Sequence, residues 1–203
     1  MSDKTREERE TARTEAFSDG VFAFAITLLV LNLRDPTASG VTLFQGLRED
    51  WPSFFALGTS FVTVLIMWMN HHNMFNYIRR IDRRLMLLNG LLLLFVVLTP
   101  YTTLLVANHL DGADASAAAA VYSGTFLLLS FVWNGLWRYC ASGHRLLGKD
   151  VSEDQAKAIT RTYSVGPLSY GIAFVVSAFS GLASVVIVLV VAGFWAVTAT
   201  LSD

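Results

Sequence analysis

The stretch Phe17-Ser18-Asp19-Gly20 runs directly into the apolar sequence Val21-Phe-Ala-Phe-Ala-Ile-Thr-Leu-Leu-Val-Leu31. It decides the fold because a polar Ser-Asp-Gly segment lies where a long apolar helix begins. At 100° per residue, one face of that helix carries a repeating line of bulky apolar side chains interrupted by a single threonine. We call this line the seam; its residues are Arg13, Phe17, Gly20, Phe24, Thr27, Leu28 and Leu31.

The composition is that of an integral membrane protein. Of the 203 residues, 54% are hydrophobic and 15% are charged, and the mean hydropathy is +0.50. Soluble domains carry more charge and less apolar surface. Because a helix needs about 20 apolar residues to cross the hydrocarbon layer, the apolar runs predict an all-α membrane protein with six transmembrane helices. The predicted spans are 16–33, 53–77, 85–107, 115–139, 163–179 and 182–201, in a single domain of residues 1–203.

No separate soluble domain is expected. The first 16 residues are polar and charged, so they do not form a signal peptide. The longest polar connection, 141–162, has only 22 residues, and Ser152 is a suitable cap for a helix that starts within it. Pro100 and Pro167 are expected to bend the third and fifth spans. The lone Cys140 excludes an intramolecular disulfide and a cysteine-based metal site.

The basic residues divide unequally between the two sides of the membrane. With six spans, 13 of the 15 Lys and Arg residues fall on the side of the chain termini, which leaves Arg34 and Arg48 on the other side. By the positive-inside rule, both termini are therefore predicted to be cytoplasmic. The opposite side has a local excess of three negative charges. These acids either attract cations to an outer mouth or are simply solvated; they are Asp35, Glu49, Asp50, Asp111 and Asp114.

Polar residues gather at one depth of the first three spans. The second span returns to the cytoplasmic side, so its polar residues lie level with the start of the first span, and Asn89 opens the third span at that level. Such side chains are costly in a membrane unless they are paired. We therefore predict a structural polar network formed by Arg13, Ser18, Asp19, Trp68, His71 or His72, and Asn89. The alternative is that these are interfacial residues near lipid headgroups.

The sequence argues against catalysis and against a bound metal. His71 and His72 are adjacent and so point about 100° apart on a helix, and no His-x-x-x-His or His-Glu-x-x-His spacing is present. There is also no Gly-x-Ser-x-Gly elbow, no phosphate-binding glycine loop and no pair of carboxylates inside a span. We therefore expect no enzyme activity, no cofactor and no nucleic-acid partner.

Two motifs together resemble a known family. Arg13-x-x-x-Phe17-Ser18-Asp19-Gly20 with its apolar run, and Trp68-x-x-His71-His72 on the second span, resemble the prokaryotic branch of the transmembrane protein 175 family of potassium channels. The resemblance covers residues 13 to about 103; the last three spans are similar only in length, order and hydrophobicity. It implies a six-span subunit with cytosolic termini, a homotetramer built from single repeats, and a pore lined by the first helix without a carbonyl filter.

The resemblance also implies roles for individual residues. Phe24, Leu28 and Leu31 are expected to form pore layers and a hydrophobic constriction, although Phe24 replaces the Ile or Leu that is usual in the family. Thr27 is expected to set cation preference; alternatively, its hydroxyl bonds back to the Ala23 carbonyl. The expected function is a passive potassium-selective channel, with K+ as the permeant ion, in a prokaryotic plasma membrane. A proton or non-selective cation leak channel on the same scaffold is the alternative, and an assembly protein with an occluded seam also fits the periodicity.

Overall fold

The computed structural model describes the backbone of residues 3–33, 35–36 and 40–200, and side chains from Glu10 to Thr198 within these ranges. The described residues form helices and no strand. The five longest α-helices form the body of the molecule: α1 (Asp3–Leu29), α3 (Trp51–Tyr77), α4 (Arg83–His109), α5 (Ala115–Ala141) and α8 (Gly181–Thr200). The shorter elements are η1 (Val30–Asn32), α2 (Leu43–Glu49), η2 (Ser142–His144), α6 (Glu153–Tyr163) and α7 (Val165–Ser177).

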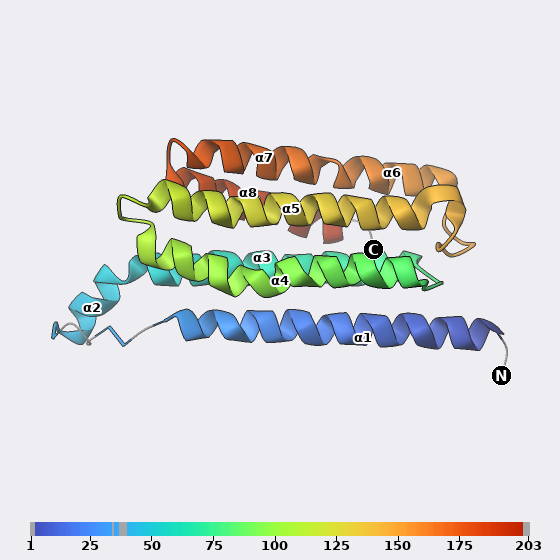
Figure 1. Ribbon diagram of the computed structural model, residues 1–203, viewed down its shortest axis with the longest axis horizontal. Coiled ribbons are helices and arrows are strands. Elements are labelled where there is room, and N and C mark those ends of the chain that lie inside the picture. The colour runs from blue at the N-terminus through green and yellow to red at the C-terminus, as the bar shows by residue number, and fades with distance from the viewer. Residues whose placement is uncertain (1–2, 34, 37–39, 201–203) are drawn as a thin grey trace.

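The helices lie in layers with their axes nearly parallel (Figure 1). In this view α1 runs along one side of the molecule, α3 and α4 lie next to it, and α5, α7 and α8 lie beyond them. The main contacts of α1 are with α3 and α4, whereas α5 packs on α4, α7 and α8. The helix that carries the seam is therefore at the edge of the described helical bundle.

Five described helices are long and apolar enough to cross a membrane: 10–32, α3, α4, 115–144 and 181–198. The all-helical architecture is thus confirmed for the described residues, with five candidate membrane spans. The sixth predicted span, 163–179, coincides with α7, whose 13 residues are fewer than a span needs. Ser164 separates α7 from the preceding α6, so these residues do not form one continuous helix of full span length. The six-span count therefore stays a prediction.

The interruption between α6 and α7 has a clear cause. Pro167 has no amide hydrogen, so it cannot bond to the carbonyl of Tyr163 four residues earlier. That carbonyl instead accepts a hydrogen bond from Nδ2 of Asn134 on α5, at 2.8 Å. Two other helix starts are capped in the usual way: Ser152 accepts from the Gln155 amide, as its sequence context indicates, and Asp82 accepts from the Leu85 amide.

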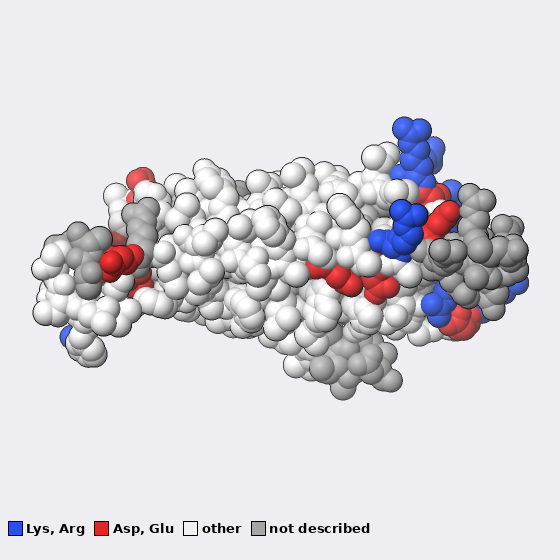
Figure 2. All heavy atoms as spheres, turned by 90° about the horizontal axis from the view of Figure 1, so that it is seen from below, with Lys and Arg blue, Asp and Glu red and all other residues white. Residues whose placement is uncertain are grey.

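Most basic residues gather at one end of the bundle. Figure 2 shows a wide, mostly uncharged band between the ends, with most of the visible Lys and Arg atoms at the end where α1 begins. The α3–α4 and α5–α6 connections lie at that same end in Figure 1. An uncharged band of this kind is what the hydrocarbon layer requires. The cytoplasmic assignment of the basic end is the prediction of the positive-inside rule.

Candidate functional site: the two faces of α1

Helix α1 is less covered than the helices it packs against. Only 22% of its most apolar stretch is buried, compared with 50% of the corresponding stretches of α3 and α4. The exposed part is what we call the outer face, formed by Phe17, Gly20, Phe24, Thr27 and Leu31. Its large side chains are 66%, 61% and 73% exposed for Phe17, Phe24 and Leu31. Most of the predicted seam therefore lies on a side of the bundle that no other part of the described chain covers.

The remaining two seam residues differ from each other. Leu28 is half-buried, whereas Arg13 is exposed. No hydrogen bond or ion pair joins the Arg13 side chain to the described residues. In this structure Arg13 therefore lies with the outer face and apart from the polar network in which the sequence analysis places it.

The opposite side of α1, which we call the inner face, is closely packed. Ser18, Phe22, Ala25 and Leu29 are all at most 1% exposed. Their spacing of four, three and four residues places them on one stripe of the helix. Because α3 and α4 cover this stripe, burial of these side chains fixes the rotation of α1 about its own axis and so determines which residues form the outer face.

A chain of three hydrogen bonds joins the inner face to both neighbouring helices. Asn89 of α4 donates from Nδ2 to Oγ of Ser18 at 2.9 Å, and its Oδ1 lies 3.0 Å from Nε2 of His71 on α3. Ser18 in turn donates to the Thr14 carbonyl at 2.9 Å. Since Asn89 uses its amide nitrogen on Ser18, its oxygen accepts, and Nε2 of His71 must carry the proton.

His71 is the buried histidine of the pair. Its ring is stacked on Phe75 with centroids 4.5 Å apart and lies 5.3 Å from the ring of Phe22. Its Nδ1 atom is buried and has no hydrogen-bond partner among the described residues. Of the two histidines that the sequence leaves open, His71 therefore joins the buried hydrogen bonds, whereas His72 is exposed.

A second set of contacts joins less buried side chains of α1 and α3. Asp19 accepts a hydrogen bond from Nε1 of Trp68 at 2.8 Å, and Glu15 lies 2.7 Å from Nδ1 of His72. The helices are antiparallel, so residues four apart on α1 meet residues four apart on α3. We call these two contacts the ladder. Glu15 is absent from the sequence-based network, although the matching spacing of Glu15–Asp19 and Trp68–His72 could have indicated it.

The segment that follows the C-terminal end of α1 also forms a hydrogen bond with α4. Asn32, in η1, donates from Nδ2 to the Pro100 carbonyl of α4 at 2.9 Å. Sequence reasoning did not assign Asn32 a role, because a single polar residue at the end of a span is usually interfacial. Together with the inner face and the ladder, this bond holds α1 to its neighbours along most of its length.

Thr27 faces outward with its hydroxyl hydrogen occupied. Its Oγ1 donates to the Phe24 carbonyl at 2.8 Å, so the back-bond exists but ends on Phe24 and not on Ala23. The hydroxyl oxygen keeps its lone pairs. An exposed threonine in this state presents an acceptor. Within the described part of the chain, no group of three or more His, Cys, Asp or Glu side chains is placed to hold a metal ion.

Comparison with known proteins identifies the family of the chain. A family model described as endosomal/lysosomal potassium channel TMEM175 matches residues 13–100, which include most of α1, all of α3 and most of α4. A potassium channel of Chamaesiphon minutus is 43% identical over 94% of this chain and 95% of its own length. The chain belongs to the TMEM175 family.

Other TMEM175-family proteins extend the match. A potassium channel of Streptomyces collinus is 41% identical over 82% of this chain and 84% of its own length. The crystal structure of a lysosomal potassium-selective channel TMEM175 homolog from Chamaesiphon minutus matches with a TM-score of 0.86 and 41% identity, over 94% of this chain and 98% of that one. The endosomal/lysosomal proton channel TMEM175 of Gallus gallus is 33% identical over 56% of this chain and 26% of its own length. These relatives are ion channels and not enzymes.

Proposed function

We propose that this protein is a passive, potassium-selective channel in which copies of α1 line a central pore. The observation that carries the proposal is the open outer face of α1, bulky and apolar, on a helix whose opposite side is fixed by buried contacts. The proposed assembly is a homotetramer of six-span subunits with cytoplasmic termini, in a prokaryotic plasma membrane. The relatives named as potassium channels support K+ as the permeant ion.

The apolar side chains of the outer face would form the constriction. Rings of apolar side chains narrow a pore and close it by dewetting. Phe24 and Leu31 are strongly exposed, whereas Leu28 is half-buried. We therefore expect Phe24 and Leu31 to reach furthest toward the axis and Leu28 to support them from the side.

Thr27 would supply the polar layer between them. Because its hydrogen is donated to the Phe24 carbonyl, its oxygen lone pairs are free to replace part of the hydration shell of a cation. A ring of four such oxygens would favour cations over anions. The buried hydrogen bonds and the ladder would have no direct ion contact; they would hold each α1 at the rotation that points Thr27 inward.

The test is ion flux into liposomes that contain the purified protein. Flux is measured under a potassium gradient, a sodium gradient and a pH step, and absence of flux in all three would exclude a channel. Thr27→Val keeps the shape but removes the hydroxyl, and Thr27→Ser keeps the hydroxyl. We expect Thr27→Val to lower the ratio of potassium to sodium flux and Thr27→Ser to preserve it. Equal ratios in the two variants would contradict the role of Thr27.

The second candidate is a proton or non-selective cation leak on the same scaffold. It is favoured by the vertebrate relative named as a proton channel. The same liposome measurement separates the two, since a leak would carry protons after a pH step or pass sodium as readily as potassium.

A further inference from the structure

A second concave site lies far from the outer face of α1. A groove of about 730 Å³ is formed between the end of α5, the η2 turn and one side of α6. Its lining includes the basic residues Arg138, Lys157 and Arg161, together with His144, Glu153 and Thr160. None of these residues belongs to the predicted pore or to the contacts that hold α1.

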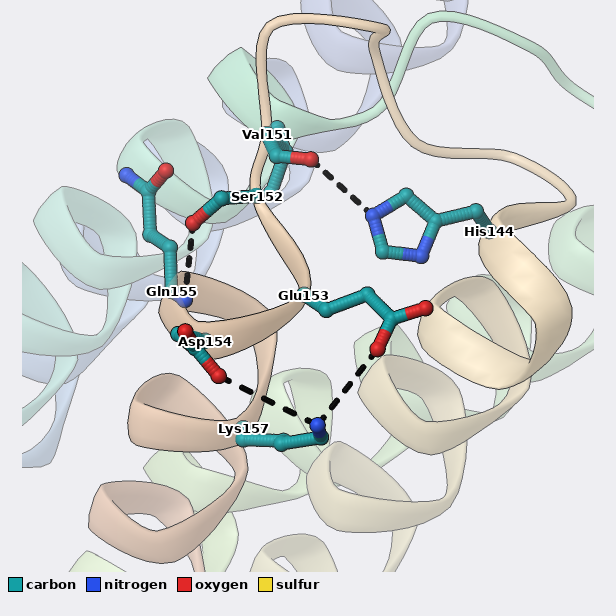
Figure 3. Close-up of polar contacts among 7 residues, drawn as sticks. All are labelled: His144, Val151, Ser152, Glu153, Asp154, Gln155 and Lys157. Carbon is teal, nitrogen blue, oxygen red and sulfur yellow. Dashed lines mark hydrogen bonds and ion pairs between the residues drawn. The ribbon is translucent and has the colours of Figure 1, made fainter.

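The walls of this groove are fixed to each other by hydrogen bonds. Trp137 of α5 donates from Nε1 to Thr160 of α6 at 2.9 Å, and Arg138 donates to Ser164 at 2.9 Å. His144 lies 2.9 Å from the Val151 carbonyl, which ties the turn after α5 to the start of α6 (Figure 3). Because this carbonyl only accepts, Nε2 of His144 donates. The groove is therefore a formed feature of the fold.

The charges in the groove are only partly compensated. Lys157 is paired, with Nζ 3.4 Å from Glu153 and 3.9 Å from Asp154 (Figure 3). Arg138 has a neutral partner, the Ser164 hydroxyl. The Arg161 side chain is exposed and forms no hydrogen bond or ion pair with the described residues. Two guanidinium groups thus face the groove without a carboxylate partner.

The position of the groove relative to the membrane indicates which type of anion it would bind. Arg138 lies in the last turn of α5, which is a candidate membrane span, and α6 leads through Ser164 into apolar α7. The groove is therefore at the depth where a membrane helix emerges from the hydrocarbon layer, which is where lipid phosphates lie. Arginine binds phosphate oxygens through paired hydrogen bonds, and basic pockets at this depth bind anionic headgroups.

We propose that this groove binds the headgroup of an anionic phospholipid, with Arg138 and Arg161 on the phosphate. The inference does not depend on the proposed pore. Glu153 limits the affinity, because it is the carboxylate that competes for Lys157 within the same groove. Removal of that carboxylate leaves Lys157 with only its longer contact to Asp154, at 3.9 Å, and so makes this cation more available to the lipid.

Native mass spectrometry of the detergent-solubilised full chain, supplied with phosphatidylglycerol or phosphatidylcholine, tests the proposal. We expect phosphatidylglycerol to stay bound and phosphatidylcholine to be lost. One basic residue near a charged lipid surface contributes about 1 kcal/mol, so Arg161→Gln should weaken retention about fivefold. Glu153→Gln should strengthen it, a change that misfolding cannot imitate. Arg83→Gln, an exposed arginine in the first turn of α4 and outside the groove, is the matched control and should have no effect.

Three results would overturn the proposal. Equal loss of lipid in Arg161→Gln and Arg83→Gln would mean that only the general charge of this end matters. Equal retention of phosphatidylcholine would mean that the headgroup charge is not recognised. Displacement of phosphatidylglycerol by millimolar inorganic phosphate would assign the groove to a soluble anion instead of a lipid.

Discussion

The inner face of α1 is in contact with neighbouring helices along its length, whereas the outer face is left open by the rest of the described chain. Ser18 and Leu29 are 0% exposed, while Phe17 and Leu31, on the same helix, are 66% and 73% exposed. Both faces are largely apolar, so hydrophobicity alone does not distinguish them. The difference is that the polar contacts of α1 with α3 and α4 lie away from the outer face, and these contacts determine which side of α1 stays uncovered.

The largest effect is expected from a bulky residue on the outer face. Gly20 is exposed, and a Cβ atom built there meets nothing within 4 Å, so Gly20→Leu should leave the protomer folded. If the outer faces of several copies meet around a pore, the same change should prevent assembly and abolish potassium flux. Light scattering of the purified protein and liposome flux measure the two outcomes.

The matched control for this prediction is Gly193→Leu on α8. Gly193 is also exposed and also has nothing within 4 Å of a built Cβ atom. We expect Gly193→Leu to assemble and conduct as the unchanged protein does. A Gly20→Leu protein with unchanged mass and flux would show that the outer face meets lipid and would remove the main support for the pore.

The next effect is expected on the inner face, from Asn89→Ala. This change removes the partner of Nε2 on His71, a fully buried side chain whose Nδ1 is already without a partner among the described residues. It also removes the donor to Ser18. Leaving buried polar groups unpaired should lower the free energy of unfolding by about 3 kcal/mol. Thermal unfolding in detergent measures it, with the exposed Asn76→Ala of α3 as the control.

The sequence predicts the part of this difference that depends on local helix geometry. It does not predict the part that depends on contacts between helices. Membership of the seam follows from helix geometry, which is local, and Phe17, Phe24, Thr27 and Leu31 are all found on the exposed side. Whether His71 or His72 is buried depends on the rotation of α3 against α1 and α4. That rotation is a tertiary property, and a sequence pattern with adjacent histidines does not contain it.

Two features show a further reason why prediction from sequence was incomplete: the contact of Glu15 and the break between α6 and α7. Glu15 belongs to a strongly charged N-terminal segment. Its spacing from Asp19 matches that of Trp68 and His72, but the composition of the segment does not tell which of its acids meets a histidine. The break at Ser164 follows from Pro167, but its position depends on Asn134 of another helix, which satisfies the Tyr163 carbonyl. In both cases the missing information is the identity of a partner that is distant in sequence.

A smaller effect is expected where the ladder is half-exposed. Trp68→Phe keeps most of the packing and removes the donor to Asp19, which is only half-buried and can recruit water. We expect a loss of about 1 kcal/mol in the free energy of unfolding, together with altered potassium flux if the ladder sets the rotation of α1. A stability loss as large as that of Asn89→Ala would mean that the ladder, and not the buried hydrogen bonds, is the principal anchor.

The smallest effect is expected at the outermost contact of the ladder. The side chains of His72 and Glu15 are 50% and 22% exposed, so solvent screens their interaction, and pairs of this kind contribute about 0.5 kcal/mol or less. A double-mutant cycle with Glu15→Gln and His72→Gln isolates the pair from the packing of each residue. A coupling energy above about 1 kcal/mol would contradict this ranking, because it would place an anchor of α1 at its exposed end. A coupling near zero would leave the rotation of α1 to Ser18, Asn89 and His71, where burial is complete.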